Sequence, residues 1–209
     1  GYVVRTFQPE AKSVVVIPTR GKSVEAVKVT PEGLFEASFP SRTKRFEYTL
    51  DVLYARKKKA LTIEDPYRFG SLIKDLDIHL WAEGTHTQAW KFMGSHPKTV
   101  GGVEGTHFVV WAPNAHRVSV VGDFNQWDGR RHGMRLLYDI GVWELFIPGV
   151  TSGTTYKYEL QSSPFDAPFL KTDPYGQYAE VRPNTASTVW TSEFEWEDKA
   201  WIQTRQETP

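Results

Sequence analysis

The chain has 209 residues, with 25 Lys and Arg against 25 Asp and Glu, so its formal net charge is zero. A nucleic-acid-binding domain normally carries a basic excess, so this balance argues against a nucleic-acid partner. The chain has no Cys, which excludes disulfides and thiolate chemistry and fits a cytoplasmic location. No apolar run approaches the roughly 20 residues that span a bilayer, so no membrane partner is expected.

The first predicted unit is a β-sandwich over residues 1–70. Short runs rich in Val, Phe and Tyr alternate apolar with polar residues and are separated by turn residues. The stretch "RGKS" (20–23) resembles the end of a phosphate-binding loop, but Val16 stands where that loop needs a Gly, so a hairpin turn is predicted. The basic run 56–59 predicts a second, solvated hairpin.

Residues 71–100 are predicted to be a connector that contains the chain's one helix, over 71–84. Apolar residues recur there at spacings of three and four: Leu72, Ile73, Leu76 and Leu80. Ser71 is placed to cap the start of this helix and Gly84 to end it. We expect the helix to pack between two β-sandwiches.

A second sandwich is predicted over residues 101–195, with a linker over 196–209. The two halves of the chain contain four similar blocks in the same order. These pairs are "VVRTFQPEAKSVVVI" and "FVVWAPNAHRVSVVG", "GLFEASFP" and "GVWELFIP", "FEYTL" and "YKYEL", and "EDPYRFG" and "KTDPYGQ". The fold class is therefore all-β, with two immunoglobulin-like β-sandwiches joined by a short helical linker. Pro9 should superpose on Pro113, and Phe35 on Trp143, with both aromatic side chains facing inward.

The sequence offers no motif for catalysis, a metal or a cofactor. The run "GGVEG" (101–105) lacks the flanking elements of a dinucleotide-binding fingerprint and is interpreted as a linker entering a strand. His79, His86 and His96 do not have metal-ligand spacing, and no pair of carboxylates stands out for acid–base hydrolysis. We therefore expect no catalytic residue, no metal and no cofactor within the chain.

A ligand-binding function is the interpretation that remains. Trp127 lies just before an Asp-Gly turn, where it either caps the core or stacks on the apolar face of a sugar ring. Lys157 either donates hydrogen bonds to sugar hydroxyls or extends into solvent. Phe165 and Phe169, in "SSPFDAPFL" (162–170), either bind or pack locally.

The run "WAPNAHRVSVVGDFNQWDGRRHGMR" (111–135), followed by "GVWELFIPG", "YKYEL" and "KTDPYG", resembles bacterial 1,4-α-glucan (glycogen) branching enzymes. The segments "EDPYRFGSLI" and "WAEGTH" are similar to the same enzymes' first domain and its connection. The second sandwich is similar to carbohydrate-binding module family 48, which branching enzymes share with debranching enzymes and with the glycogen-binding subunit of a kinase. The resemblance implies two β-sandwiches that precede a catalytic (β/α)8 barrel, and a chain that stops before that barrel.

The same resemblance implies particular sugar-binding residues. Trp127 matches the module's stacking Trp, with Asn125 in the same "FNQW" run, and Lys157 matches its hydroxyl-binding Lys. The module's second stacking Trp has no match, because this loop offers only Phe165 and Phe169. Its late Asn is loosely matched by Asn184.

The predicted function is therefore a non-catalytic N-terminal part of a glycogen branching enzyme. The parent protein would transfer α-1,4-glucan chains to form α-1,6 branches, whereas the 209 residues alone would be inactive. The expected partners are α-glucans (glycogen, amylose and maltooligosaccharides) and the enzyme's own barrel. The alternatives are a stand-alone glycogen-binding or scaffold module, and the N-terminal part of a debranching or trehalose-releasing relative.

Overall fold

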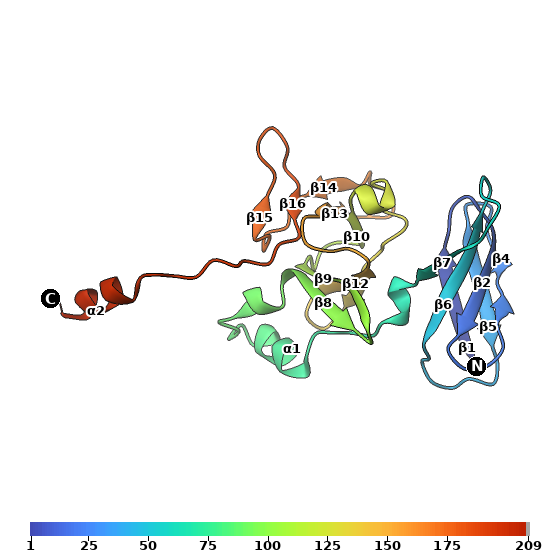
Figure 1. Ribbon diagram of the computed structural model, residues 1–209, viewed down its shortest axis with the longest axis horizontal. Coiled ribbons are helices and arrows are strands. Elements are labelled where there is room, and N and C mark those ends of the chain that lie inside the picture. The colour runs from blue at the N-terminus through green and yellow to red at the C-terminus, as the bar shows by residue number, and fades with distance from the viewer. Residues whose placement is uncertain (208–209) are drawn as a thin grey trace.

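A computed structural model describes residues 1–207. Its first unit, in blue and cyan in Figure 1, is a sandwich of two antiparallel sheets. The strands of one sheet, in spatial order, are β1 (Tyr2–Phe7), β5 (Leu34–Phe39) and β4 (Val27–Lys28). Those of the other are β3 (Val24–Glu25), β2 (Ala11–Pro18), β6 (Tyr48–Tyr54) and β7 (Leu61–Glu64). Because side chains alternate across a strand, β2 buries Val14 and Val16 fully between the sheets.

The second unit is also a sandwich of antiparallel sheets. One sheet has the order β11 (Arg135–Leu137), β12 (Val142–Pro148), β9 (Val103–Trp111) and β8 (Gly94–Val100). The other has the order β10 (Arg117–Val121), β13 (Thr155–Gln161), β16 (Ser187–Thr188) and β15 (Tyr178–Ala179), with β14 (Phe169–Lys171) also paired to β13. The core between these sheets includes Phe108, Trp143 and Tyr156. The prediction of an all-β fold with two sandwiches is confirmed.

The two sandwiches have equivalent strand pairing, as the internal repeat predicts. β1 pairs with β5, with Thr6 opposite Phe35, and β9 pairs with β12, with Val110 opposite Trp143. Phe35 and Trp143 are both buried in the cores of their units, so the predicted inward-facing aromatic positions are confirmed. Likewise, β2 pairs with β6 in the first unit and β10 with β13 in the second.

The repeated Asp-Pro-Tyr runs form the same hydrogen-bonded corner in each unit. The Tyr48 hydroxyl donates to Asp65 Oδ2 at 2.8 Å, and the Tyr158 hydroxyl donates to Asp173 Oδ2 at 3.1 Å. The other oxygen of each carboxylate accepts from the backbone N–H two residues later. Burial raises the pKa of Asp65 to about 6 and also raises the pKa of Asp173. Each corner therefore ties a buried tyrosine of the sheet to the segment that begins at the aspartate.

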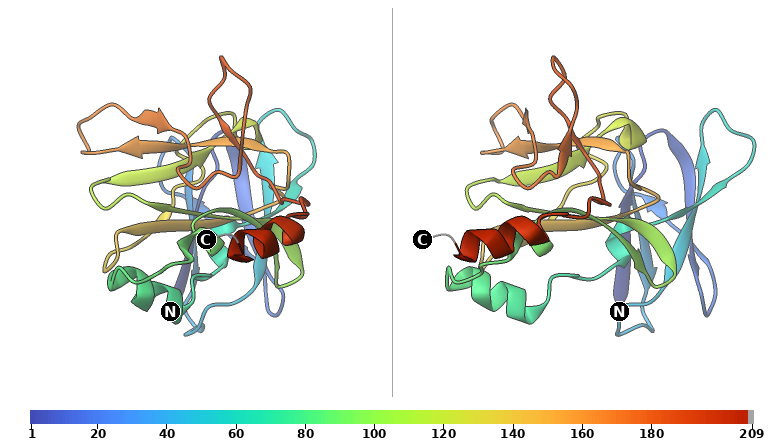
Figure 2. Two further views of the ribbon diagram at one scale, coloured as in Figure 1. Left: turned by 90° about the vertical axis from the view of Figure 1, so that its left-hand side faces the viewer. Right: turned by 60° about the vertical axis from the view of Figure 1, so that its left-hand side comes forward.

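The connector helix lies in a different place from the one predicted. α1 (Asp75–Ala82) packs its Ile78 and Trp81 side chains toward a cluster on the outer face of the β8–β9–β12 sheet. In Figure 1 and the right-hand view of Figure 2, α1 lies on the second unit, on the side remote from the first. The expectation that the helix packs between the sandwiches is therefore wrong. The segment that joins the two units contains a short 3-10 helix, η1 (Pro66–Arg68).

The start of α1 also differs from the prediction, whereas its end agrees. Lys74, not Ser71, precedes the helix, because the N–H of Leu72 donates to Glu144 on the sheet and holds this stretch extended. Gly84 follows the helix with φ of +71°. Its N–H donates to the Trp81 carbonyl while the N–H of Thr85 donates to Leu80, which is the Schellman arrangement.

Glu144 is the side chain that fastens the connector to the sheet. It is almost fully buried and accepts hydrogen bonds from His107 at 3.0 Å, Arg135 at 3.2 Å and the N–H of Leu72 at 3.1 Å. Burial works to raise the pKa of Glu144, but hydrogen bonds, of which the one from His107 is the strongest, outweigh it and hold the pKa at about 2. Side chains of β12 on the outer face of the sheet are therefore not exposed to solvent, because the connector covers that face.

Three further segments differ from the sequence-based description. The predicted linker "GGVEG" is instead a hairpin turn, in which Gly101 and Gly102 both have positive φ and join β8 to β9. β8 lies within the range predicted as connector. A short 3-10 helix, η2 (Ala89–Lys91), precedes it. The predicted linker 196–209 contains a helix, α2 (Lys199–Glu207), and its last two residues lie outside the described part of the chain.

No helix within residues 1–207 is both long enough and apolar enough to cross a membrane.

Candidate functional site

The loop that follows β10 holds Trp127 at the surface. After Val121 the chain makes a short 3-10 helix, η3 (Asp123–Asn125), and Trp127 then adopts a positive φ of 59°. Its backbone N–H donates to the Gly122 carbonyl at 3.0 Å, and its indole Nε1 donates to Asp123 Oδ1 at 2.8 Å. These two bonds fix both the backbone and the ring.

Phe124, not Trp127, packs against the core from this loop. The Trp127 side chain remains exposed, with a relative accessibility of 37% for the residue. The prediction that Trp127 is at least partly exposed is therefore confirmed, and the core-capping alternative is not. Because the polar end of the indole is satisfied by Asp123, the aromatic face is the part left for a ligand.

Lys157 lies beside Trp127 through the pairing of β10 with β13, in which Val121 faces Lys157. Its neighbours Tyr156 and Tyr158 point into the core, so Lys157 lies on the outer face of the sheet. The Lys157 ammonium donates to Thr185 Oγ1 at 2.7 Å. An ammonium has three N–H donors, so two remain for a ligand.

Trp127 and Lys157 line one surface pocket of about 420 Å3 together with Asn184. The Asn184 amide donates to Glu180 at 3.4 Å, which leaves its carbonyl oxygen and its second N–H for a ligand. Asp123, Thr155, Glu180 and Thr185 complete the polar wall of the pocket. The arrangement therefore offers one flat aromatic surface bordered by hydrogen-bond donors and acceptors.

Asn125, which the sequence places among the sugar-binding residues, has a different position. The residue is 1% exposed. Its Oδ1 accepts from the Gly122 N–H at 3.0 Å, while Nδ2 donates to the Val120 carbonyl and to His132 Nδ1, both at 2.8 Å. Burial lowers the pKa of His132 to about 4, so the ring is neutral, and in the tautomer with its proton on Nε2 the Nδ1 atom accepts from Asn125. Asn125 therefore shapes the loop and does not face a ligand.

Phe165 and Phe169 also lie away from this pocket. Phe165 is 96% exposed in the loop between β13 and β14. Phe169 is paired with Leu160, a residue packed against the core, so it points to the sheet face opposite Lys157. Neither replaces a second stacking residue next to Trp127.

Several residues that line the pocket do not stand out in the sequence. Asp123 lies only four residues before Trp127, and this short spacing is the signal that could have predicted its hydrogen bond to the indole. Thr185 and Glu180 come from the loop between β15 and β16, whose two ends are joined by the bond from the Ala186 N–H to Glu180. The bond from Lys157 to Thr185 links this loop to the sheet at the pocket. No local pattern marks that loop, because its position depends on strands paired at a distance.

The side chains that line the pocket offer contacts for a ligand. Within residues 1–207, no group of three or more His, Asp or Glu side chains has metal-binding geometry. The carboxylates that line the pocket, Asp123 and Glu180, are already bonded to Trp127 and to the loop at Ala186. Stacking on the indole and hydrogen bonds at its border are what these residues supply.

Two family descriptions match the chain. Residues 92–176 match carbohydrate-binding module 48 (isoamylase N-terminal domain), and residues 1–67 match the N-terminal domain of the alpha-1,4-glucan branching enzyme GlgB. The 1,4-alpha-glucan branching enzyme GlgB of Paramagnetospirillum magneticum is 46% identical over 203 residues, and that of Rubrobacter xylanophilus 46% over 205. The chain matches the N-terminal region of the GlgB branching enzymes. These alignments cover 97% of this chain but only 27% and 28% of the two relatives.

Only some of the residues that line the pocket lie within the range that matches module 48. Trp127 and Lys157 lie inside the matched range, whereas Asn184 and Thr185 lie beyond its end at residue 176. A solved pullulanase type I from Bacillus subtilis, complexed with maltose, is 14% identical, with a TM-score of 0.41 over 93% of this chain and 26% of that chain.

Proposed function

We propose that this chain is the non-catalytic N-terminal part of a glycogen branching enzyme and that its second sandwich binds α-glucan at Trp127. The observation that carries the proposal is the single pocket that brings together Trp127, Lys157 and Asn184. The matches to module 48 and to GlgB enzymes support the ligand class. A cytoplasmic location stays a prediction of the cysteine-free composition.

The proposed binding mode follows from the geometry of the pocket. A glucose ring has an apolar C–H face that stacks on an indole and an edge of hydroxyls that take hydrogen bonds. Asp123 holds the indole of Trp127 in place, so little conformational entropy is lost when a sugar stacks on it. The two remaining donors of Lys157 and the amide of Asn184 are placed for the hydroxyls. The site is small, so binding of a single glucan segment should be weak.

We further propose that the catalytic barrel of the intact enzyme packs against this chain. The C-terminal segment leaves the second sandwich and leads to α2 at the far left of Figure 1. It carries exposed aromatic side chains that have no place in a sandwich core: Phe194, Trp196 and Trp201. Exposed aromatic residues of this kind are typical of a surface that meets another domain.

Electrophoresis through gels containing glycogen tests the binding proposal. The chain should be retarded, and Trp127→Ala should remove most of the retardation, because one aromatic anchor contributes roughly 2 kcal/mol or more to an interface. A millimolar complex has only about 4 kcal/mol of binding free energy, so that loss is decisive. Trp90→Ala is the matched control, since Trp90 is 58% exposed and lies outside this pocket.

Two results would contradict the proposal. If Trp127→Ala migrates like the unaltered chain in glycogen gels, Trp127 is not the stacking surface. If the unaltered chain shows no retardation at any glycogen concentration, the second sandwich serves only to pack against the rest of the enzyme. In both cases the melting temperature of each variant must be measured, so that unfolding is not mistaken for lost binding.

A further inference from the structure

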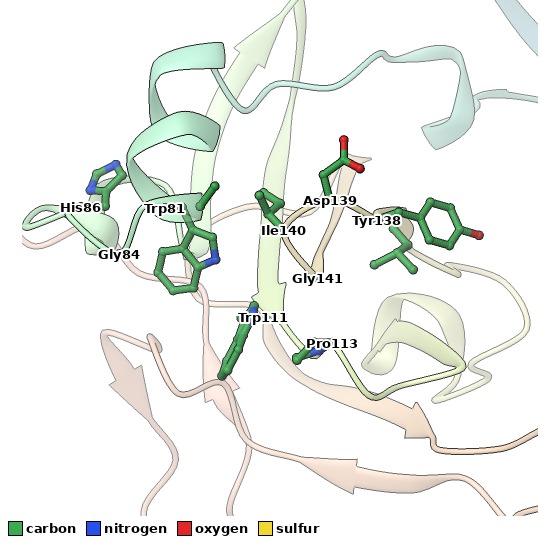
Figure 3. Close-up of a pocket in the computed structure, with 11 residues that line it drawn as sticks. Trp81, Gly84, His86, Trp111, Pro113, Tyr138, Asp139, Ile140 and Gly141 are labelled. Atoms are coloured by element: carbon green, nitrogen blue, oxygen red, sulfur yellow. The ribbon is translucent and has the colours of Figure 1, made fainter.

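A second and larger hollow lies on the other side of the second unit. It has a volume of about 630 Å3, within the range of roughly 300–1,000 Å3 that is typical of small-molecule sites. Three elements form it: the end of α1, the corner where β9 ends, and the hairpin between β11 and β12. Figure 3 shows the side chains that carry the argument, which are Trp81, His86, Trp111, Pro113, Tyr138 and Asp139.

The hollow has a supported aromatic surface. Trp111, the last residue of β9, is 53% exposed even though its indole is large and apolar. Trp81 contacts it in an edge-to-face arrangement, with ring centroids 6.2 Å apart and planes at 68°. Trp81 is itself braced by Phe92 at 6.0 Å in an edge-to-face contact. Trp111 is thus held on one side by a packed aromatic residue and leaves its remaining surface open.

The polar groups on the rim are free to bind. The side chains of Tyr138 and Asp139 make no hydrogen bond or ion pair with any other part of the chain that the structure describes, and Tyr138 is 84% exposed. His86 differs, because its Nε2 contacts Asp77 at 3.0 Å and its Nδ1 accepts from the Gln88 N–H. His86 therefore supplies only its ring as a wall, whereas Tyr138 and Asp139 supply a hydroxyl and a carboxylate.

The hairpin that carries these polar groups is fixed against the Trp111 corner. The N–H of Ala112 donates to the Gly141 carbonyl at 3.0 Å. Gly141 has φ of +66°, and a Cβ there would lie only 2.7 Å from the Cβ of Pro113. The two walls of the hollow therefore touch, and the distance between the aromatic surface and the rim does not depend on a mobile loop.

We propose that this hollow is a second α-glucan-binding site. The Trp111 indole suits the apolar C–H face of a neutral sugar ring, while Figure 3 shows the side chains of Asp139 and Tyr138 across the hollow and directed away from Trp111. An oligosaccharide of several rings, stacked on the indole through one ring, places the hydroxyls of another ring where they can donate to Asp139. No Lys or Arg among the residues that the structure describes lines the hollow, which disfavours an anionic ligand. The proposal takes its ligand class from the proposed function and adds a separate place of binding.

The second site lies on the opposite sheet from the pocket at Trp127, which allows both sites to bind one polymer. Trp111 belongs to the β9 sheet, whereas the pocket at Trp127 follows β10 in the opposite sheet. One glucan polymer presents many identical segments, so two weak sites on opposite faces bind it more tightly than either one alone.

The experiment follows the indole N–H signals of the chain by NMR during titration with maltoheptaose. In Trp127→Ala, the Trp111 signal should still shift, and in Trp111→Ala the Trp127 signal should still shift. In glycogen gels each single variant should weaken retention by about tenfold or more, and the double variant should lose it. Trp90→Ala should leave both signals and the retention unchanged.

Tyr138→Ala is a second variant that distinguishes lost binding from a folding defect. Trp111 also supports Trp81, so its replacement affects packing, whereas Tyr138 lies at an exposed hairpin tip. Tyr138→Ala should weaken the maltoheptaose-dependent shift at Trp111 with an unchanged melting temperature.

The outcomes separate this inference from the proposed function. A Trp111 signal that does not move, or that moves only while Trp127 is present, overturns the second site. A Trp111 signal that moves while the Trp127 signal does not supports the second site and contradicts the proposed pocket.

Discussion

Replacing Asn125 with Ala distinguishes a structural from a sugar-binding role for this residue. Asn125 is 1% exposed and makes hydrogen bonds to the Gly122 N–H, the Val120 carbonyl and His132 Nδ1. Each such bond contributes about 1 kcal/mol net, so the substitution should lower the free energy of unfolding by about 3 kcal/mol. For a chain of this size that corresponds to a fall in melting temperature of roughly 6–12 °C.

Thermal unfolding and glycogen gels should give opposite results for the two single variants Asn125→Ala and Trp127→Ala. Trp127→Ala removes one exposed hydrogen bond to Asp123, so its melting temperature should change little while retention in glycogen falls by about tenfold or more. Asn125→Ala should melt early, yet it should keep measurable retention well below its melting temperature, because Trp127 and Lys157 are still present. An Asn125→Ala variant that melts normally and fails to bind glycogen would refute this reasoning and restore Asn125 as a direct ligand.

Two further predictions concern the second sandwich. Glu144→Gln should lower the free energy of unfolding at pH 7 by about 3 kcal/mol, from the difference between an ordinary pKa of 4.5 and the folded value of about 2. Because the folded pKa of Glu144 is depressed, this stabilisation is present above pH 4.5 and is lost between pH 4.5 and 2. Urea unfolding should therefore show the free energies of the unaltered chain and of Glu144→Gln converging as the pH falls. A difference that stays constant with pH would contradict the prediction. Gly141→Ala should melt below Gly149→Ala, since both positions have positive φ but only Gly141 is crowded, by Pro113. Equal melting temperatures would show that the contact with Pro113 is relaxed at no cost.

The sequence predicts the fold well because the internal repeat presents the same strand and turn patterns twice, in the same order. A strand pattern such as that of β2 is ambiguous alone, but its recurrence in β10 in the same order of elements makes two sandwiches the simplest interpretation. The repeat also predicts the inward positions of Phe35 and Trp143, which the structure confirms. Trp127 stands out for a different reason, because it precedes a local Asp-Gly turn that places a large aromatic residue at the surface.

The remaining site residues could not be predicted because their roles depend on tertiary contacts. Asn125 has the polar side chain of a ligand-binding residue, yet its partners His132 and Val120 come from both sides of the loop. Phe169 is turned from the pocket by its register with Leu160, which no short stretch of sequence specifies. The start of α1 was misplaced for the same reason, since the N–H of Leu72 bonds to Glu144, a residue far along the chain.

The difference between the two sandwiches explains why only the second has candidate sites. The loop after β2, residues 19–23, contains no aromatic residue, whereas the loop after β10, residues 122–134, contains Phe124 and Trp127. Phe124 packs against the core, which leaves Trp127 on the surface. On the opposite sheet, the connector buries β12 on both faces and places Trp81 beside Trp111. Both hollows are therefore products of segments added around a common β-framework, and a glucan that binds the second unit should find no equivalent surface on the first.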